Sequence, residues 1–173
     1  MRQIWTALAA AAVAGATLTG CSINVSSGPP VVAKAELQKD ISDRMDKGGE
    51  KPQSVTCKDD LKGEVGNNVT CEVTISDTNQ IDAIVTVTKV DGSTVSYDTA
   101  PALSKEQLEK SVARLVAGTA SGVAESVTCE SGLEGKQGAE AKCDVTDVEG
   151  TTTKVTATVT EVKGLLMNFN VTS

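Results

Sequence analysis

The sequence of 173 residues predicts an α+β protein built from two tandem repeats, each with one helix packed on an antiparallel sheet of about four strands. The first observation behind this prediction is that residues 54–57, Ser-Val-Thr-Cys, recur as residues 126–129, and that the offset of 72 persists to the end of the chain. The second is that each copy opens with apolar residues at helical spacing and continues with alternating strands. We expect repeat 1 to span residues 31–99 and repeat 2 to span residues 100–173.

Residues 1–20 have the features of a lipoprotein signal peptide. Arg2 is followed by an apolar run, Ile4 to Leu18, which is shorter than the roughly 20 residues that a membrane-spanning helix needs. The sequence Leu-Thr-Gly-Cys that ends at Cys21 resembles a bacterial lipobox, which implies cleavage before Cys21 and lipidation of that residue with a diacylglyceryl group and often a further acyl chain. Two or three acyl chains suffice for stable membrane anchoring. Residues 21–30, rich in Ser, Gly and Pro, are expected to form a tether.

One amphipathic helix is predicted at the start of each repeat. In repeat 2, Ser104 and Gln107 have the spacing of a capping box. In repeat 1, Ala33 stands where the cap should be, so we expect that helix to fray more at its start. The apolar stripes that face the sheet are Leu37, Ile41 and Met45 in repeat 1, and Leu108, Val112, Leu115 and Val116 in repeat 2.

The strands of each repeat alternate between an apolar and a Thr-rich face. Gly92 and Gly164 mark the last hairpin of repeat 1 and repeat 2, respectively, and Tyr97 in repeat 1 matches Phe169 in repeat 2. One face is therefore expected to pack on the helix and the other to face water. The inward positions predicted for repeat 1 are Val55, Cys57, Cys71, Val73, Ile75, Ala83, Val85, Val87, Val95 and Tyr97.

Four of the five cysteines fall into two pairs with equal spacing, and Cys21 is the fifth. Three connectivities are open to four cysteines, but only bridges within the repeats, Cys57 to Cys71 and Cys129 to Cys143, give both copies the same topology. We expect these disulfides to be structural, because a redox-active dithiol usually has the spacing Cys-x-x-Cys. Disulfides are typical of proteins outside the cytoplasm.

These features together resemble a known group of proteins. A lipobox, a short amphipathic helix, Val-Thr-Cys, a Leu-x-Gly turn, a Gly before the second Cys and a Val-Thr-Val-Thr strand that ends at a Gly hairpin are similar to small secreted and lipid-anchored proteins of mycobacteria and related actinobacteria. Those proteins carry a domain of unknown function, present here in two copies. The resemblance implies a disulfide-bonded α+β domain at the extracytoplasmic face of the bacterial cell membrane, and it brings no catalytic residues.

Composition excludes several classes of function. Removal of residues 1–20 takes away Arg2 and no acidic residue, so the net charge falls from −7 to −8 and nucleic acid is a poor partner. The chain has no His and one each of Phe, Trp and Tyr, so we expect no enzyme, no metal site and no cofactor. A calcium ion at Asp144, Asp147 and Glu149 is a less favoured alternative to a solvated acidic turn.

The function that best fits the sequence is a non-catalytic, lipid-anchored module that binds or scaffolds another envelope protein. Leu166, exposed where the strand alternation breaks, and Thr86 and Thr158 on the polar face are the candidate contacts. An inhibitor of a secreted hydrolase is the first alternative, because the tandem architecture is similar to that of beta-lactamase inhibitory proteins. A lipid carrier is the second alternative. The orientation of the repeats and the oligomeric state are left open.

Overall fold

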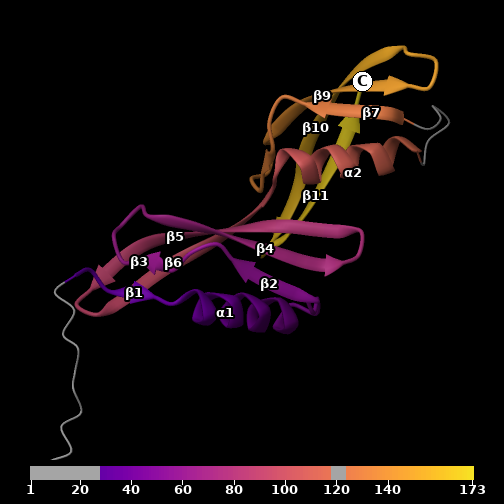
Figure 1. Cartoon of the computed structure of the whole chain (residues 1–173). Coiled ribbons are helices and arrows are strands. Elements are labelled where there is room, and N and C mark those ends of the chain that lie inside the picture. Colours follow the sequence, from indigo (N-terminus) through magenta and orange to yellow (C-terminus); the bar gives the residue numbers. More distant parts are fainter. Residues whose placement is uncertain (1–27, 118–123) are drawn as a thin grey trace, which may run out of the picture.

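The computed structural model describes residues 28–117 and 124–173. The signal peptide, Cys21 and the first part of the expected tether lie outside the described residues. The predicted α+β class is confirmed: each repeat has one helix, an antiparallel sheet and one disulfide. Figure 1 shows the two repeats, called unit 1 and unit 2 below, with each helix on one face of its own sheet.

Unit 1 begins with a short strand that precedes its helix. The central sheet has the order β2-β4-β5-β6, with β8 of unit 2 added beside β6, and β1 pairs separately with β3. All neighbours are antiparallel. The elements are β1 (Val31–Val32), α1 (Lys34–Lys47), β2 (Ser54–Cys57), β3 (Leu61–Lys62), β4 (Asn68–Ser76), β5 (Asn79–Asp91) and β6 (Thr94–Leu103).

Unit 2 repeats this arrangement, with a sheet of order β7-β9-β10-β11. A bulge interrupts β10 between Val159 and Glu161, at the position equivalent to the bulge between Val87 and Lys89 in β5. The bulge explains why inward-facing residues change phase near the end of each long strand. The elements are α2 (Lys105–Ala117), β7 (Ala124–Cys129), β8 (Leu133–Glu134), β9 (Glu140–Asp147), β10 (Thr152–Lys163) and β11 (Leu166–Thr172).

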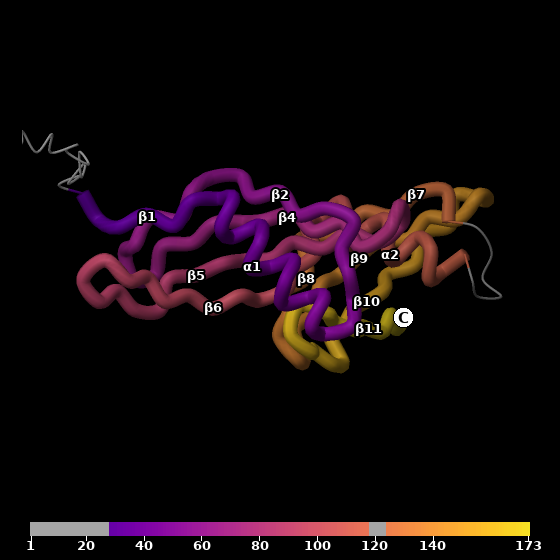
Figure 2. Tube along the Cα trace, turned by 90° about the horizontal axis from the view of Figure 1, so that it is seen from below, coloured from indigo at the N-terminus to yellow at the C-terminus, as the bar shows by residue number. Residues whose placement is uncertain are grey.

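The two units share strand β6. Its last two residues, Ala102 and Leu103, pair with β8 as β1 pairs with β3 in unit 1, so the last strand of unit 1 is also the first strand of unit 2. The Gly135 N–H donates to the Pro101 carbonyl at 2.8 Å, and the Gly63 N–H donates in the same way to the Pro30 carbonyl at 2.6 Å. The units are therefore joined by a continuous strand, which is visible from below in Figure 2.

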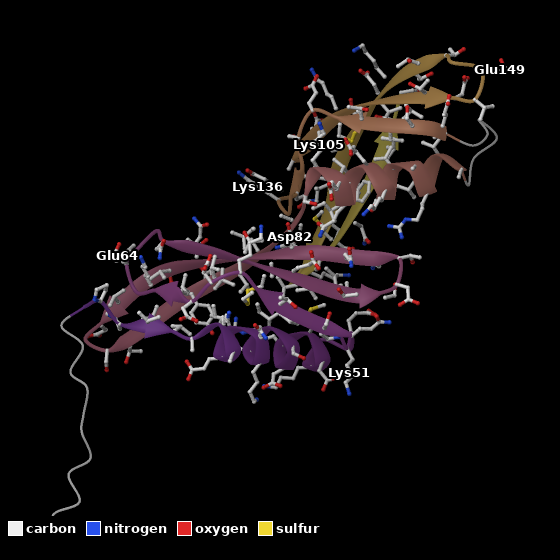
Figure 3. The ribbon with its side chains drawn as sticks, in the orientation of Figure 1. Lys51, Glu64, Asp82, Lys105, Lys136 and Glu149 are labelled. Atoms are coloured by element: carbon white, nitrogen blue, oxygen red, sulfur yellow. A yellow bond between two sulfur atoms is a disulfide. The ribbon has the colours of Figure 1, made fainter. Side chains whose placement is uncertain are left out.

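Side chains reinforce this junction. The Gln107 amide of α2 donates to the Asp82 carboxylate of β5 at 3.1 Å, and the Arg114 guanidinium donates to the Thr78 carbonyl. Asp82 lies on the side of the unit 1 sheet that faces unit 2 (Figure 3). Leu165, in the β10–β11 turn, is only 7% exposed and lies near Met45 at the end of α1. These contacts hold the second unit against the first at three places besides β6.

The core of each unit is apolar and follows most of the predicted pattern, but the prediction that Leu115 faces the sheet is wrong, since its side chain is 46% exposed. Leu37, Ile41 and Met45 of α1 are buried, as are Leu108 and Val112 of α2. Cys57–Cys71 and Cys129–Cys143 form the two disulfides, each joining directly opposed residues of neighbouring strands. None of the helices in residues 28–117 and 124–173 is long and apolar enough to cross a membrane.

The helix starts differ in the way that the sequence predicts, with one addition. The Ser104 N–H donates to Gln107 Oε1 at 2.9 Å and the Gln107 N–H donates to Ser104 Oγ at 3.3 Å, so the capping box of α2 is confirmed. Ala33 provides no side-chain cap to α1. Instead, Asp60 accepts a hydrogen bond from the Lys34 N–H at 2.8 Å, which satisfies one of the free donors from a distant loop.

Candidate interaction surface

The helix of each unit covers only part of its sheet. α1 packs mainly over β2, and α2 mainly over β7, which is the equivalent edge strand. The strands at the other edge, β6 in unit 1 and β11 in unit 2, therefore lie away from the helix. The side chains between the helix and that far strand therefore determine how much of the inner face of the sheet is exposed to solvent.

In unit 1, three polar side chains bridge this space from α1 to β6. The Tyr97 hydroxyl of β6 donates to Asp40 Oδ2 of α1 at 2.9 Å, and Arg44 Nε donates to the same oxygen at 2.8 Å. The Arg44 guanidinium also lies 5.7 Å from the centre of the Tyr97 ring, within the range of a cation–π contact. Burial, and then the hydrogen bond to Asp40, raises the pKa of Tyr97 to about 12, so the phenol stays neutral.

In unit 2, the equivalent positions cannot form this cluster. Ser111, Leu115 and Phe169 replace Asp40, Arg44 and Tyr97, so the hydroxyl, the carboxylate and the guanidinium are all missing. Leu115 is 46% exposed and Phe169 is half-buried. A groove of about 620 Å³ lies here between the end of α2 and the sheet. Its apolar lining consists of Leu115, Val116, Ala124, Val145, Val155, Phe169 and Val171.

Strand β11 forms one wall of this groove and is also the edge of its sheet. The N–H and C=O of Val159 bond toward β9, to Ala139 and Gly138, so the opposed Phe169 directs its own backbone groups away from β10. By alternation, Met167 and Val171 do the same. β11 contains no charged residue and no proline, the features that usually protect an edge strand.

The predicted contact residues lie at separate places. Leu166, at the start of β11, is 36% exposed, as predicted, and its neighbour Met167 packs against the core. Thr86 in β5 and Thr158 in β10 are half-buried on the sheet face opposite the helices. The structure thus places Leu166 at the junction of the units, in a pocket with Arg44 and Thr99, and not in the groove of unit 2. The contact role of all three stays a prediction.

Sequence reasoning missed the groove itself, although its signal was present. The tandem alignment shows the three exchanges at an offset of 71 in the helix and 72 in the strand. What could not be seen was that these three positions meet in space, because the helix could lie over either half of the sheet. The burial of Leu165 was missed for the same reason: a hydrophobic residue in a turn becomes buried only where another unit covers it.

The acidic turn of unit 2 is organised by hydrogen bonds within the chain. Asp147 Oδ1 accepts from the N–H groups of Glu149 at 2.9 Å and Thr151 at 2.8 Å, and Asp144 forms an ion pair with Lys154 at 3.4 Å. Glu149 lies at the far tip of unit 2 (Figure 3). Within the two described ranges, no three His, Cys, Asp or Glu side chains are grouped so that they could hold a metal ion.

Comparison with known proteins agrees with the duplication seen in the structure. The family model for a domain of unknown function, DUF4333, matches residues 16–92 and again residues 94–164. No match was found among curated proteins or among solved structures. The two disulfides indicate an extracytoplasmic location, because such bonds rarely persist in the cytoplasm. Since the two matches together cover most of its length, the chain belongs to the DUF4333 family and carries that domain as a tandem pair with one disulfide in each copy.

Proposed function

We propose that this chain is a non-catalytic protein of the bacterial cell envelope, anchored by lipid on Cys21, and that unit 2 binds another protein through its groove and the adjoining edge of β11. The leader of residues 1–20, the Leu-Thr-Gly-Cys sequence and the resemblance to actinobacterial lipoproteins support the anchor. With unit 1 following closely after the lipidated residue, unit 2 would extend away from the membrane, where a partner could reach it.

The observation that carries the binding role is the difference between two otherwise equivalent units. Unit 1 bridges the space between its helix and β6 with Tyr97, Asp40 and Arg44, and Leu165 of unit 2 lies beside it. Unit 2 instead leaves Leu115 and Phe169 at the rim of a partly apolar groove. Exposed apolar side chains beside a groove are typical of interaction sites on soluble domains. Because unit 1 has the same fold with side chains bridging this space, the groove of unit 2 is not a requirement of the fold.

Photo-crosslinking in living cells tests this proposal with a matched control inside the chain. A photoreactive residue is placed at Leu115 beside the groove, and at Arg44, which is the equivalent of Leu115 in unit 1. A third is placed at Leu166, which lies at the junction of the units beside Arg44. Photoreactive residues at Thr86 and Thr158 report on the sheet faces that do not carry the helices. We expect one repeated protein adduct from Leu115 and none from Arg44 or Leu166. Equal capture of abundant neighbours from all positions would refute a specific binding surface.

Lipid binding is a second candidate that the groove favours. A volume of about 620 Å³ lies within the range of small-molecule sites, roughly 300 to 1,000 Å³, and the lining near Val145 and Val155 is apolar. The expected result of native mass spectrometry would then be a copurified lipid that is lost in a Leu115→Arg variant. A ligand-free spectrum of protein taken directly from membranes would eliminate this candidate.

A further inference from the structure

The free edge of β11 can be assigned a partner from its sequence and its charge. In unit 1, the edge of β6 already receives a strand from another unit: Ala102 and Leu103 pair with β8, and Pro101 accepts from the Gly135 N–H. At the repeat offset of 72, however, β11 is equivalent to residues 94–100 of β6, which precede the residues that pair with β8. In unit 2, β11 occupies the same place in the sheet and has no further strand beside it among the described residues.

Resting on the proposed binding role of unit 2, we propose that its partner is a second copy of this chain, paired antiparallel along β11 about a twofold axis at Phe169. The two four-stranded sheets then form one continuous sheet of eight strands. Such pairing is isologous, the commonest symmetry of homodimers. It also brings the two grooves together, because each lies beside β11 on the face that carries the helix.

The sequence of β11 is self-complementary in this register. Phe169 opposes Phe169 of the second copy, and Met167 opposes Val171 of the second copy, so apolar side chains meet on the groove side. On the other face Asn168 opposes Asn170 of the second copy, and amide pairs there can hydrogen-bond. The outward N–H and C=O groups of Met167, Phe169 and Val171 lie opposite their counterparts, as an antiparallel ladder requires.

Charge favours β11 over the other edges. The whole chain has a net charge of −7, so a second copy is repelled wherever acidic side chains meet. β6 carries Asp98 and β7 carries Glu125, whereas β11 is uncharged over seven residues. β2 is uncharged too, but has only four residues. A head-to-tail contact of the kind that β6 makes with β8 would need β3 of the second copy, and β3 is already paired with β1.

Cysteine crosslinking of the full chain, extracted from membranes in mild detergent, tests the register. Opposed residues of a hydrogen-bonded antiparallel pair lie about 5.5 Å apart at Cα, which a disulfide can span. Phe169→Cys should therefore crosslink to itself on oxidation. Val171→Cys and Met167→Cys should each stay uncrosslinked alone and should crosslink when mixed. No dimer at position 169, or equal crosslinking at all three positions, would overturn the proposal.

Two variants with an unchanged core keep the test independent of folding. Asn168 and Asn170 are exposed, and a lysine at 168 keeps its contact with Glu161, which Asn168 now reaches at 3.2 Å. Asn168→Lys with Asn170→Lys opposes like charges in the dimer and should weaken it about tenfold. Asn168→Lys with Asn170→Glu opposes unlike charges and should retain it. Equal sedimentation of the two variants would contradict self-pairing along β11.

The outcomes also separate this inference from the proposed function. A homotypic adduct from the photoreactive residue at Leu115 supports both. An adduct with a different protein, together with monomeric wild-type chain, refutes self-pairing and leaves the binding role of unit 2 in place. Absence of any specific adduct refutes both.

Discussion

Removal of the Cys57–Cys71 disulfide should destabilise unit 1 enough to be seen as a separate early unfolding step. The perturbation is the double variant Cys57→Ala with Cys71→Ala. The bridge closes a loop defined by a sequence separation of 14, and the chain-entropy estimate for such a loop is about 3 kcal/mol. Both cysteines are buried, at 4% and 0% exposure, so the lost sulfur contacts raise the expected cost to about 3 to 5 kcal/mol.

This cost is large for a unit of this size. A folded unit of roughly 70 residues has a free energy of unfolding of about 4 to 10 kcal/mol, and its urea m value is on the order of 1 kcal/mol/M. The unfolding midpoint of unit 1 should therefore fall by about 3 M urea or more. Tyr97 is the only tyrosine, and it lies in unit 1. In protein without residues 1–20, which contain the single Trp, its fluorescence reports on that unit, while far-ultraviolet circular dichroism reports on both.

The matched control is Cys129→Ala with Cys143→Ala in unit 2. It should move the circular dichroism transition strongly and the Tyr97 transition less, because the units share β6 but have separate cores. If the free energy of unfolding of the unit 1 variant falls by less than about 1 kcal/mol, the reasoning is refuted, because the disulfide would then not reduce the conformational entropy of the unfolded chain as the estimate assumes. Equal shifts of Tyr97 in both variants would show that the two units unfold as one.

Two further predictions concern Tyr97 and the junction. Because the pKa of Tyr97 is raised from 10.0 to about 12, the neutral phenol stabilises the fold below pH 10, and this contribution is lost as the pH rises toward 12. The ultraviolet absorbance of the single tyrosine should therefore titrate near 12 in the native protein and near 10 in denaturant. Tyr97→Phe should remove this part of the alkaline destabilisation. A native midpoint near 10 would contradict the burial of the hydroxyl. Gly135→Ala would place a methyl group against the carbonyl and ring of Pro101, so we expect its free energy of unfolding in urea to fall by about 2 to 4 kcal/mol. In the control Gly150→Ala the added carbon meets no atom, and the free energy of unfolding should fall by only about 1 kcal/mol because of the positive φ. Equal costs at the two glycines would argue against the β6–β8 junction.

The local patterns of this sequence determined most of each unit. Alternation at period two gave the inward residues of β4, β5 and β10, and helical spacing gave the buried stripes of α1 and α2, because these periods follow from backbone geometry alone. The capping box at Ser104 and the disulfides within the repeats are local or symmetric features for the same reason. The duplication itself was readable because both copies kept their cysteine spacing.

Only the tertiary structure decided how the units join and where one of them stays open. That β6 serves both sheets, that Asp60 caps α1 and that Leu165 is buried all depend on contacts between segments far apart in the chain, which no local period encodes. The groove of unit 2 depends on which half of the sheet α2 covers, and this is set by packing against β7. The exchange of Arg44 for Leu115 and of Tyr97 for Phe169 stood in the sequence throughout, but only the fold brings these positions together across the inner face of the sheet.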